Sequence, residues 1–210
     1  MKYVRALVWM FLIFLGVYLP AFILVGVLRP RGAGTVLLII IASFLVALLI
    51  MTIFLTRHGW SRKDFGLVST GKKYLIWAFV LGGVLGLIVA FLQHILRIPS
   101  PQTFEAFAFW QIVLLFWIGA SVQEEMIFRS LIQSVVGRTL GSEGTLTWGP
   151  LSAAAVIVAV LFAIIHIPMG AFTACAALVA GVLAGEIRAR SGSILPAIIV
   201  HAMFNITGTL

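Results

Sequence analysis

The chain has 210 residues, of which 62% are hydrophobic and 10% are charged, and its formal net charge is +8. Soluble domains carry about 25% charged residues, so this composition excludes a water-soluble enzyme, a disordered chain and a fibrous repeat. It predicts an all-α, polytopic transmembrane helical bundle, because helices satisfy their own backbone hydrogen bonds in lipid.

Seven apolar runs, separated by polar or Gly- and Pro-containing breaks, predict about seven transmembrane spans. In chain order they cover residues 4–28, 34–56, 74–98, 103–136, 150–167, 170–187 and 193–210. The first run is longer than the core of a signal peptide and no clear cleavage site follows it, so we expect an uncleaved anchor. The break after the second run mixes basic and aromatic residues, which is typical of an interfacial segment.

The basic residues lie mostly in the breaks between the runs. Ten Lys and Arg fall on the side of the N-terminus and of the second, fourth and sixth breaks, and three fall on the opposite side. The positive-inside rule then predicts a cytoplasmic N-terminus, in a cell (plasma) membrane protein. The expected partners of these charges are anionic membrane lipids rather than nucleic acid. The single cysteine, Cys175, excludes an intrachain disulfide and a thiolate cluster.

Two pairs of glycines lie four residues apart inside predicted spans. Gly82 and Gly86 are in the third run, and Gly181 and Gly185 are in the sixth. Small residues at this spacing let helix backbones approach closely, so we expect packing faces rather than chemistry at these positions.

The candidate functional residues are the ionisable ones inside apolar runs, since each costs about 2.5–3.5 kcal/mol at the centre of a membrane. On a helix, Glu125 and Arg129 lie four residues apart, which predicts an ion pair. Glu124 points about 100° away from Glu125 and has no cation on its own helix, which makes it a candidate general base. The alternative is that both acids only satisfy Arg129 or a neighbouring helix.

Two histidines, His166 and His201, are further candidate functional residues, and they lie on two other predicted helices. His166 follows Phe162 by one turn, and is open either to a packing role or to a chemical one. His201 and Asn205 share a helix face and could both donate to one point, as a developing oxyanion requires, or could form an interhelical hydrogen-bonding pair. One carboxylate and two histidines from three helices indicate general acid–base hydrolysis or a metal site. HExxH, nucleophile-elbow and Walker A patterns are absent.

These residues resemble the motifs of the CPBP family, which comprises the type II CAAX prenyl endopeptidases and bacterial relatives linked to bacteriocin processing and self-immunity. The motifs EExxxR, FxxxH and HxxxN occur as residues 124–129, 162–166 and 201–205. The resemblance covers residues 104–210, which we treat as a CPBP-like catalytic core following N-terminal helices in residues 1–103, within one integral membrane domain. Ser130 and Ser191 stand where the family commonly has Gly and Thr.

The resemblance implies an intramembrane endopeptidase whose active site lies in the C-terminal helices. Glu124 and His166 would activate water, and His201 and Asn205 would form the oxyanion hole. Glu125, Arg129 and Phe162 would shape the site. No cofactor is required in this scheme, and the alternative is a zinc enzyme with Glu124, His166 and His201 as ligands.

The implied substrate is a membrane-associated peptide held at the cytoplasmic side, and prenylated CAAX peptides are the family's best-known class. Two non-enzymatic alternatives remain open. One is a membrane immunity or scaffold protein that uses the same cavity to bind a peptide or lipid. The other is a transporter, because buried acids and histidines also form proton relays.

Overall fold

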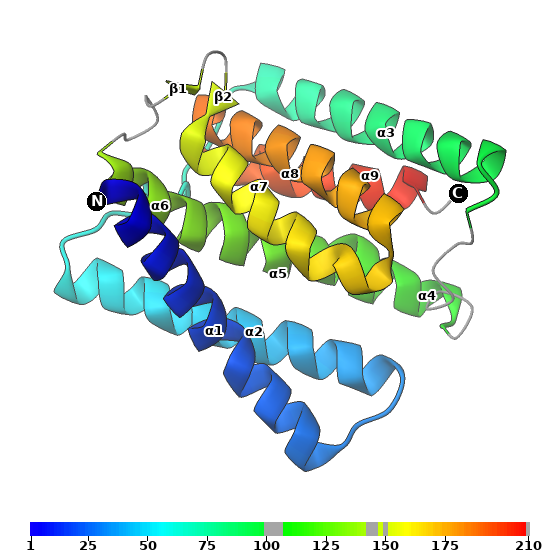
Figure 1. Ribbon diagram of the computed structural model, residues 1–210, viewed down its shortest axis with the longest axis horizontal. Coiled ribbons are helices and arrows are strands. Elements are labelled where there is room, and N and C mark those ends of the chain that lie inside the picture. Colours follow the sequence, from blue (N-terminus) through cyan, green and yellow to red (C-terminus); the bar gives the residue numbers. More distant parts are fainter. Residues whose placement is uncertain (99–106, 142–146, 149–150, 209–210) are drawn as a thin grey trace.

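In the computed structural model, the helices begin and end close to the predicted runs (Figure 1). The structure describes residues 1–98, 107–141, 147–148 and 151–208. The helices are α1 (Lys2–Leu28), α2 (Ala33–Arg57), α3 (Lys72–Ile95), α4 (Phe109–Gln111), α5 (Ser121–Glu125), α6 (Gln133–Leu140), α7 (Ala153–His166), α8 (Ala171–Ser191) and α9 (Leu195–Gly208). The ends of three predicted runs, residues 103–106, 150 and 209–210, lie outside the described residues.

The fourth predicted run is one continuous helix, Phe109–Leu140. Within it, two π-helical segments, η2 (Ile112–Ala120) and η3 (Met126–Ile132), separate α4, α5 and α6. The 3₁₀ turn η4 (Ile167–Met169) extends α7, and a two-residue antiparallel ladder joins β1 (Thr147–Trp148) to β2 (Leu151–Ser152). The protein is therefore an all-α membrane bundle, as predicted.

Fewer helices are long enough to cross a membrane than the seven apolar runs predicted. Among the described residues, five helices are long and apolar enough to cross a membrane. The helices α7 and α9 have 14 residues each, which is about 21 Å against about 30 Å of hydrocarbon. The α7 helix ends at His166, close to the predicted end at residue 167, and Gly170, whose φ is 111°, follows the turn; the helix begins only at Ala153, after its N-cap Ser152. Seven apolar helices are confirmed, but by length only five of them are candidate spans.

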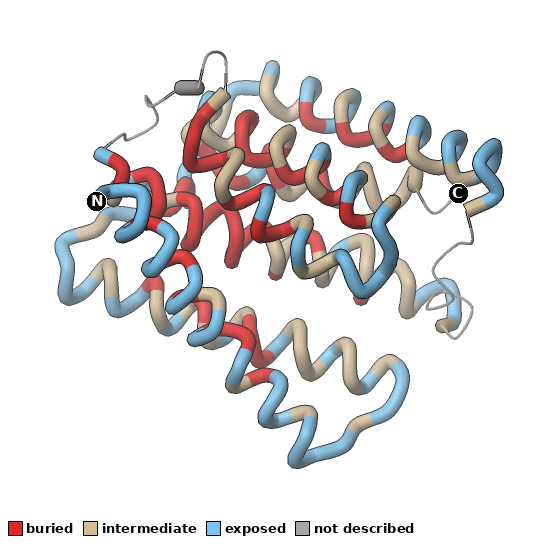
Figure 2. Tube along the Cα trace, in the orientation of Figure 1, coloured by how far each residue is buried: buried red, intermediate tan, exposed pale blue. Residues whose placement is uncertain are grey.

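The helices form a body and an arm (Figure 1). The arm is the α1–α2 hairpin, which lies beside the body formed by α3 to α9. Many residues on the outer faces of α1, α2 and α3 are exposed (Figure 2). Many of these exposed residues are large and apolar, which is typical of surfaces that face lipid. Every residue of η3 is buried, so this segment, which directly follows the two adjacent glutamates, is the centre of the bundle.

Both predicted glycine faces are packing contacts. A Cβ atom on Gly82 would lie 2.9 Å from Val200 Cα of α9, and one on Gly86 would lie 2.6 Å from the Phe204 carbonyl oxygen. A Cβ atom on Gly185 would lie 2.8 Å from Ala155 Cβ of α7. The close approach of α3 to α9 and of α7 to α8 therefore depends on glycine.

Gly82→Ala is expected to destabilise the protein by about 1–3 kcal/mol, because the added methyl group overpacks the contact between α3 and α9. The neighbouring substitution Gly83→Ala is the matched control, since its Cβ would make only ordinary van der Waals contacts, with Met203 Cε at 3.7 Å and Thr207 Cγ2 at 4.0 Å. Thermal unfolding in detergent should show a lower Tm for the first variant alone. Equal Tm values for the two variants would contradict the packing assignment.

Candidate active site

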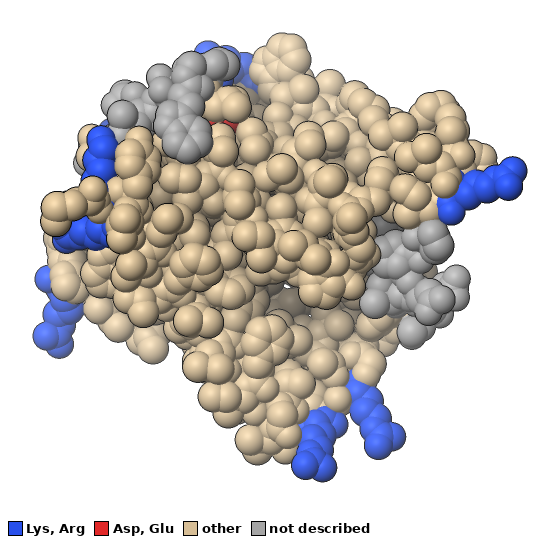
Figure 3. Space-filling model, in the orientation of Figure 1, with Lys and Arg blue, Asp and Glu red and all other residues tan. Residues whose placement is uncertain are grey.

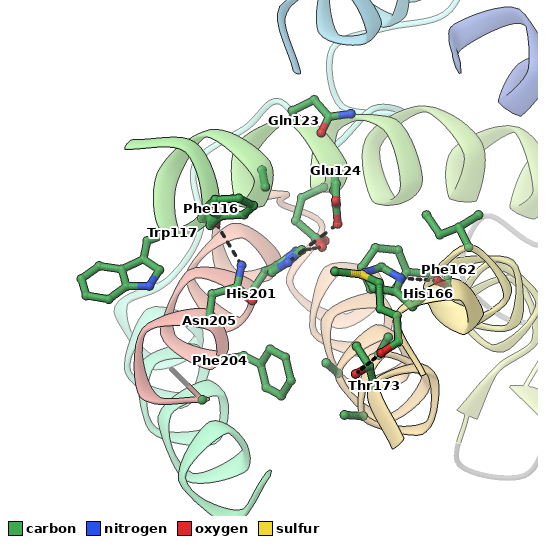
Figure 4. A pocket seen from close by; sticks show the side chains of 18 of the residues that line it. Phe116, Trp117, Gln123, Glu124, Phe162, His166, Thr173, His201, Phe204 and Asn205 are labelled. Carbon is green, nitrogen blue, oxygen red and sulfur yellow. Dashed lines mark hydrogen bonds and ion pairs between the residues drawn. The ribbon is translucent and has the colours of Figure 1, made fainter. Parts of the chain in front are cut away.

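A cavity of about 530 Å³ lies between the arm and the body (Figure 4). Its walls come from α1, α2, α3, the long helix Phe109–Leu140, and α7, α8 and α9. All seven residues predicted for the site line it: Glu124, Glu125, Arg129, Phe162, His166, His201 and Asn205. The fold therefore brings together residues that lie up to 81 positions apart in the chain.

The predicted ion pair between Glu125 and Arg129 is present. Glu125 Oε1 lies 3.1 Å from Arg129 Nη1, and each side chain is 1% exposed. The contact is a charge pair rather than an aligned hydrogen bond, because both terminal nitrogens of Arg129 are buried without a hydrogen-bond partner among the described residues. The guanidinium also lies over the Phe162 ring, 4.4 Å from its centroid, where a cation–π contact stabilises it.

Glu125 has a second partner that helix spacing could not reveal. Its Oε1 accepts a hydrogen bond of 2.8 Å from His201 Nδ1 of α9. A carboxylate accepts and does not donate, so this bond assigns the Nδ1 proton and fixes the orientation of the imidazole. Glu125 is therefore a positioning residue for His201 as well as the partner of Arg129.

Glu124 is the carboxylate that faces the cavity (Figure 4). Its side chain is 20% exposed, and Oε2 lies 3.8 Å from His201 Nε2. Among the described residues, no Lys or Arg forms an ion pair with it. The two adjacent glutamates are thus in different environments, one paired and buried and the other facing the cavity, as their helical offset predicted.

His166 is held by the backbone of its own helix. Its Nδ1 lies 2.7 Å from the Phe162 carbonyl oxygen, which can only accept, so Nδ1 donates. In the neutral ring, Nε2 then carries the lone pair and can accept a proton. The Phe162 ring contacts both imidazoles, with centroid distances of 4.6 Å to His166 and 5.8 Å to His201.

Asn205 lies in the cavity wall, but its amide nitrogen is directed at the long helix. It donates to the Phe116 carbonyl oxygen at 3.0 Å and to Ser121 Oγ at 3.3 Å. The carbonyl belongs to the π-helical segment η2, and π segments frequently occur at functional sites. Before its amide nitrogen could donate to an oxyanion beside His201, Asn205 would have to release either the Phe116 carbonyl oxygen or Ser121 Oγ.

Four polar residues near the site were not among the predicted ones: Tyr18, Ser43, Ser121 and Gln123. Gln123 Nε2 donates to Tyr18 Oη at 3.1 Å and to Ser43 Oγ at 2.9 Å, which joins the arm to the helix that carries Glu124. The only signal in the sequence was a glutamine next to Glu124 within an apolar run. The N-terminal helices thus contribute directly to the cavity, although their sequences contain no diagnostic motif.

The zinc site with Glu124, His166 and His201 as ligands is the alternative interpretation of the same residues. Within the described ranges, no group of three or more His, Cys, Asp or Glu side chains is arranged to hold a metal ion. The Nδ1 atoms of His201 and His166 contact Glu125 and the Phe162 carbonyl oxygen, which leaves the two Nε2 atoms as the nitrogens that could bind a ligand.

The cavity lies in one half of the bundle. Its outer wall is formed by residues near helix ends. Val36 lies near the start of α2, Gln93 near the end of α3 and Phe109 at the start of α4. Met169 and Phe172 lie at the turn between α7 and α8. Figure 3 shows the surface hollowed between the arm and the body. The described side chains of this outer wall are apolar or uncharged, whereas the charged groups and imidazoles lie deeper.

Residues 106–207 match the family model described as type II CAAX prenyl endopeptidase Rce1-like. The match contains all three motifs from which the resemblance was identified. Searches of curated proteins and of solved structures found no match. Residues 106–207 are therefore a Rce1-like segment, and they include four of the seven helices that line the cavity: the long helix Phe109–Leu140, α7, α8 and most of α9.

Proposed function

Because residues 106–207 form a Rce1-like segment, we propose that this integral membrane protein is an intramembrane endopeptidase that uses Glu124, His166 and His201. The observation that carries the proposal is the convergence of these three side chains, from three helices, on one cavity with apolar outer walls. A carboxylate and an imidazole in one cavity are suited to general acid–base hydrolysis.

In the proposed mechanism, a water molecule lies between Glu124 and His166. Glu124 accepts a proton as the water oxygen attacks the scissile carbonyl carbon, and the tetrahedral intermediate carries the negative charge on the former carbonyl oxygen. The proton then passes to the amide nitrogen, the C–N bond breaks, and the products are a carboxylate and an amine. His166 Nε2, which is free to accept, orients the water.

His201 has a specific requirement in this mechanism. Its Nδ1 donates to Glu125, so in the neutral ring its Nε2 carries a lone pair and cannot donate. His201 can therefore stabilise the oxyanion only as the imidazolium, and the adjacent Glu124 and Glu125 are the carboxylates that balance its charge. Asn205 would add a second donor after releasing either Phe116 or Ser121.

The test is a cleavage screen with purified protein. A farnesylated CAAX reporter peptide and a library of membrane peptides are compared with wild-type protein and Glu124→Gln. Repeating the assay with a zinc chelator separates the two chemistries: cleavage that survives chelation supports the metal-free mechanism, and cleavage restored by added zinc supports the alternative. Cleavage of the farnesylated peptide would identify a prenylated substrate.

The distribution of charge supports a proposal for the side from which the substrate enters. The ten basic residues on the N-terminal side lie at one end of the bundle, and Figure 3 shows several Lys and Arg side chains at the left, where Figure 1 marks the N-terminus. The outer wall of the cavity lies toward the other end. If the N-terminus is cytoplasmic, this arrangement favours entry from the extracytoplasmic half of the membrane over the cytoplasmic side that the resemblance implies. We propose that the N-terminus is cytoplasmic and that the peptide enters from the extracytoplasmic half of the membrane.

Cysteine labelling on intact cells tests this orientation. In a Cys175→Ala background, Met169→Cys places a thiol beside the cavity and Ser69→Cys places one in the exposed loop before α3. A membrane-impermeant maleimide is expected to label Met169→Cys directly and Ser69→Cys only after permeabilisation. The reverse pattern would assign a cytoplasmic substrate, and the unlabelled Cys175→Ala parent is the control.

A further inference from the structure

A second cavity, of about 320 Å³, lies at the opposite end of the bundle from the open part of the active site. It is formed by the loop after α2, by α6 and by the C-terminal end of α8. Its charged lining consists of Lys63, Arg138 and Arg188 with a single carboxylate, Asp64. The cavity therefore has an excess of positive charge, and it lies beside the C-terminal ends of α2, α6 and α8.

The carboxylate of Asp64 is bound to Ser61 rather than to the cations of the cavity. Asp64 Oδ2 accepts hydrogen bonds from the Ser61 backbone N–H at 2.6 Å and from Ser61 Oγ at 2.8 Å. The backbone hydrogen bond from Ser61 holds the pKa of Asp64 below its usual range, so Asp64 is ionised at neutral pH. Within the described part of the chain, none of the three cations forms an ion pair. The nearby Glu186 binds the Ser152 N–H and Arg190 and does not line this cavity.

The two arginines are positioned by fixed contacts. The Arg138 guanidinium lies 4.6 Å from the centre of the Trp60 ring, which stacks on the fully buried Phe65. Arg188 Nη2 donates to the Asp64 carbonyl oxygen at 3.0 Å and to Ser134 Oγ at 3.3 Å. Its Nε is buried without a hydrogen-bond partner among the described residues. Both guanidinium groups are therefore held in place before any ligand binds.

The loop that carries Lys63 and Asp64 is itself anchored to the bundle. Ser134 Oγ donates to the Asp64 carbonyl oxygen at 2.7 Å, and Ser130 Oγ donates to the Phe65 carbonyl oxygen at 2.7 Å. Gly66 has a φ of +71°, and a Cβ there would lie 2.9 Å from Arg188 Cζ. Glycine is thus needed at this position both for the turn and for the space that the guanidinium occupies. The loop backbone and Arg188 are thus fixed to the bundle, while Lys63 and Arg138, whose side chains are exposed, lie at the mouth of the cavity.

We propose that this cavity binds a phosphate group, and that its source is the headgroup of an anionic phospholipid. Guanidinium groups favour phosphate oxygens because their planar N–H donors match them. Basic pockets between the ends of transmembrane helices are suited to anionic headgroups. The inference is independent of the proposed peptidase activity, since no residue of this cavity lines the active site.

The test compares two double variants that each remove two positive charges from the same end of the protein. Lys63→Gln/Arg138→Gln alters the cavity, and Arg57→Gln/Arg62→Gln, at exposed positions outside it, is the matched control. Each protein is titrated with phosphatidylglycerol, phosphatidylcholine and inorganic phosphate, and binding is followed by the shift in Tm and by native mass spectrometry. Removing one basic residue is expected to weaken phosphatidylglycerol binding about fivefold. Because the cavity variant lacks two basic residues, its binding is expected to be roughly 25-fold weaker than that of the wild type.

Selective loss of phosphatidylglycerol binding in the cavity variant, with phosphatidylcholine inactive, supports the proposal. If inorganic phosphate binds the wild type as well as phosphatidylglycerol does, and the cavity variant loses that binding, the cavity is a phosphate site whose ligand is free phosphate rather than a lipid headgroup. Equal weakening in both double variants would show a diffuse surface attraction and overturn the proposal, as would no binding to wild-type protein. The single variant Lys63→Gln, at an exposed side chain, provides the same comparison if the double variant does not fold.

Discussion

Glu124→Gln is expected to lower kcat/KM for peptide cleavage by at least about 100-fold, the lower end of the usual effect of removing a general base. Glutamine preserves the size of the side chain and its hydrogen-bonding oxygen but cannot accept the proton of the attacking water. Because Glu124 forms no ion pair with Lys or Arg among the described residues, the substitution leaves no buried cation without a partner. The Tm of the variant should therefore stay close to that of the wild type.

The matched control for this prediction is Glu186→Gln. Glu186 is also a largely buried glutamate of a membrane helix, but it binds Ser152 and Arg190 and lies outside the active-site cavity. Its replacement should preserve kcat/KM. If Glu124→Gln retains wild-type cleavage, the proposed general base is wrong; if both variants lose activity equally, the loss reflects general damage to the fold.

Arg129→Met is expected to destabilise the protein by about 3–5 kcal/mol, because it leaves Glu125 as a buried charge without its cation. The side chains of both residues are 1% exposed, so water cannot take the place of the guanidinium. The variant also loses the cation–π contact with Phe162. Thermal unfolding and the yield of folded protein in detergent measure this effect.

The double variant Glu125→Leu/Arg129→Met separates stability from chemistry. Replacing a buried ion pair with apolar side chains is often close to neutral, so the double variant should recover much of the lost Tm. It should not recover cleavage, because His201 Nδ1 no longer has the acceptor that orients the ring. A double variant with wild-type kcat would show that Glu125 does not position His201, and an Arg129→Met variant of unchanged Tm would show that the ion pair contributes little.

The identity of the helices could be predicted from the sequence because lipid imposes one simple requirement on a spanning segment, a long apolar run with internal hydrogen bonds. The lengths of α7 and α9 could not be predicted as well. The turn at Pro168 and Gly170 ends α7 close to the predicted position, but α7 begins at Ala153, after its N-cap Ser152, and α9 begins at Leu195, whereas the apolar runs begin at residues 150 and 193. Hydrophobicity identifies apolar segments, but it does not show whether each crosses the whole bilayer.

Within the site, contacts along one helix were predictable and contacts between helices were not. The four-residue spacing of Glu125 and Arg129 determined their ion pair. The hydrogen bond from His201 to Glu125 and the engagement of Asn205 by Phe116 each join helices far apart in the chain. No periodicity within one segment can show which atoms of another segment it will meet.

The sequence by itself determined an all-α membrane bundle, the motifs of its C-terminal core, and the uneven placement of its basic residues. Only the tertiary structure decided that Glu125 is bound to His201 while Glu124 faces the cavity, and that the cavity lies toward the end opposite to most of the basic residues. The reason is physical. Charge counting and helical spacing are one-dimensional properties of the chain, whereas the position of a cavity depends on how seven helices of unequal length pack together.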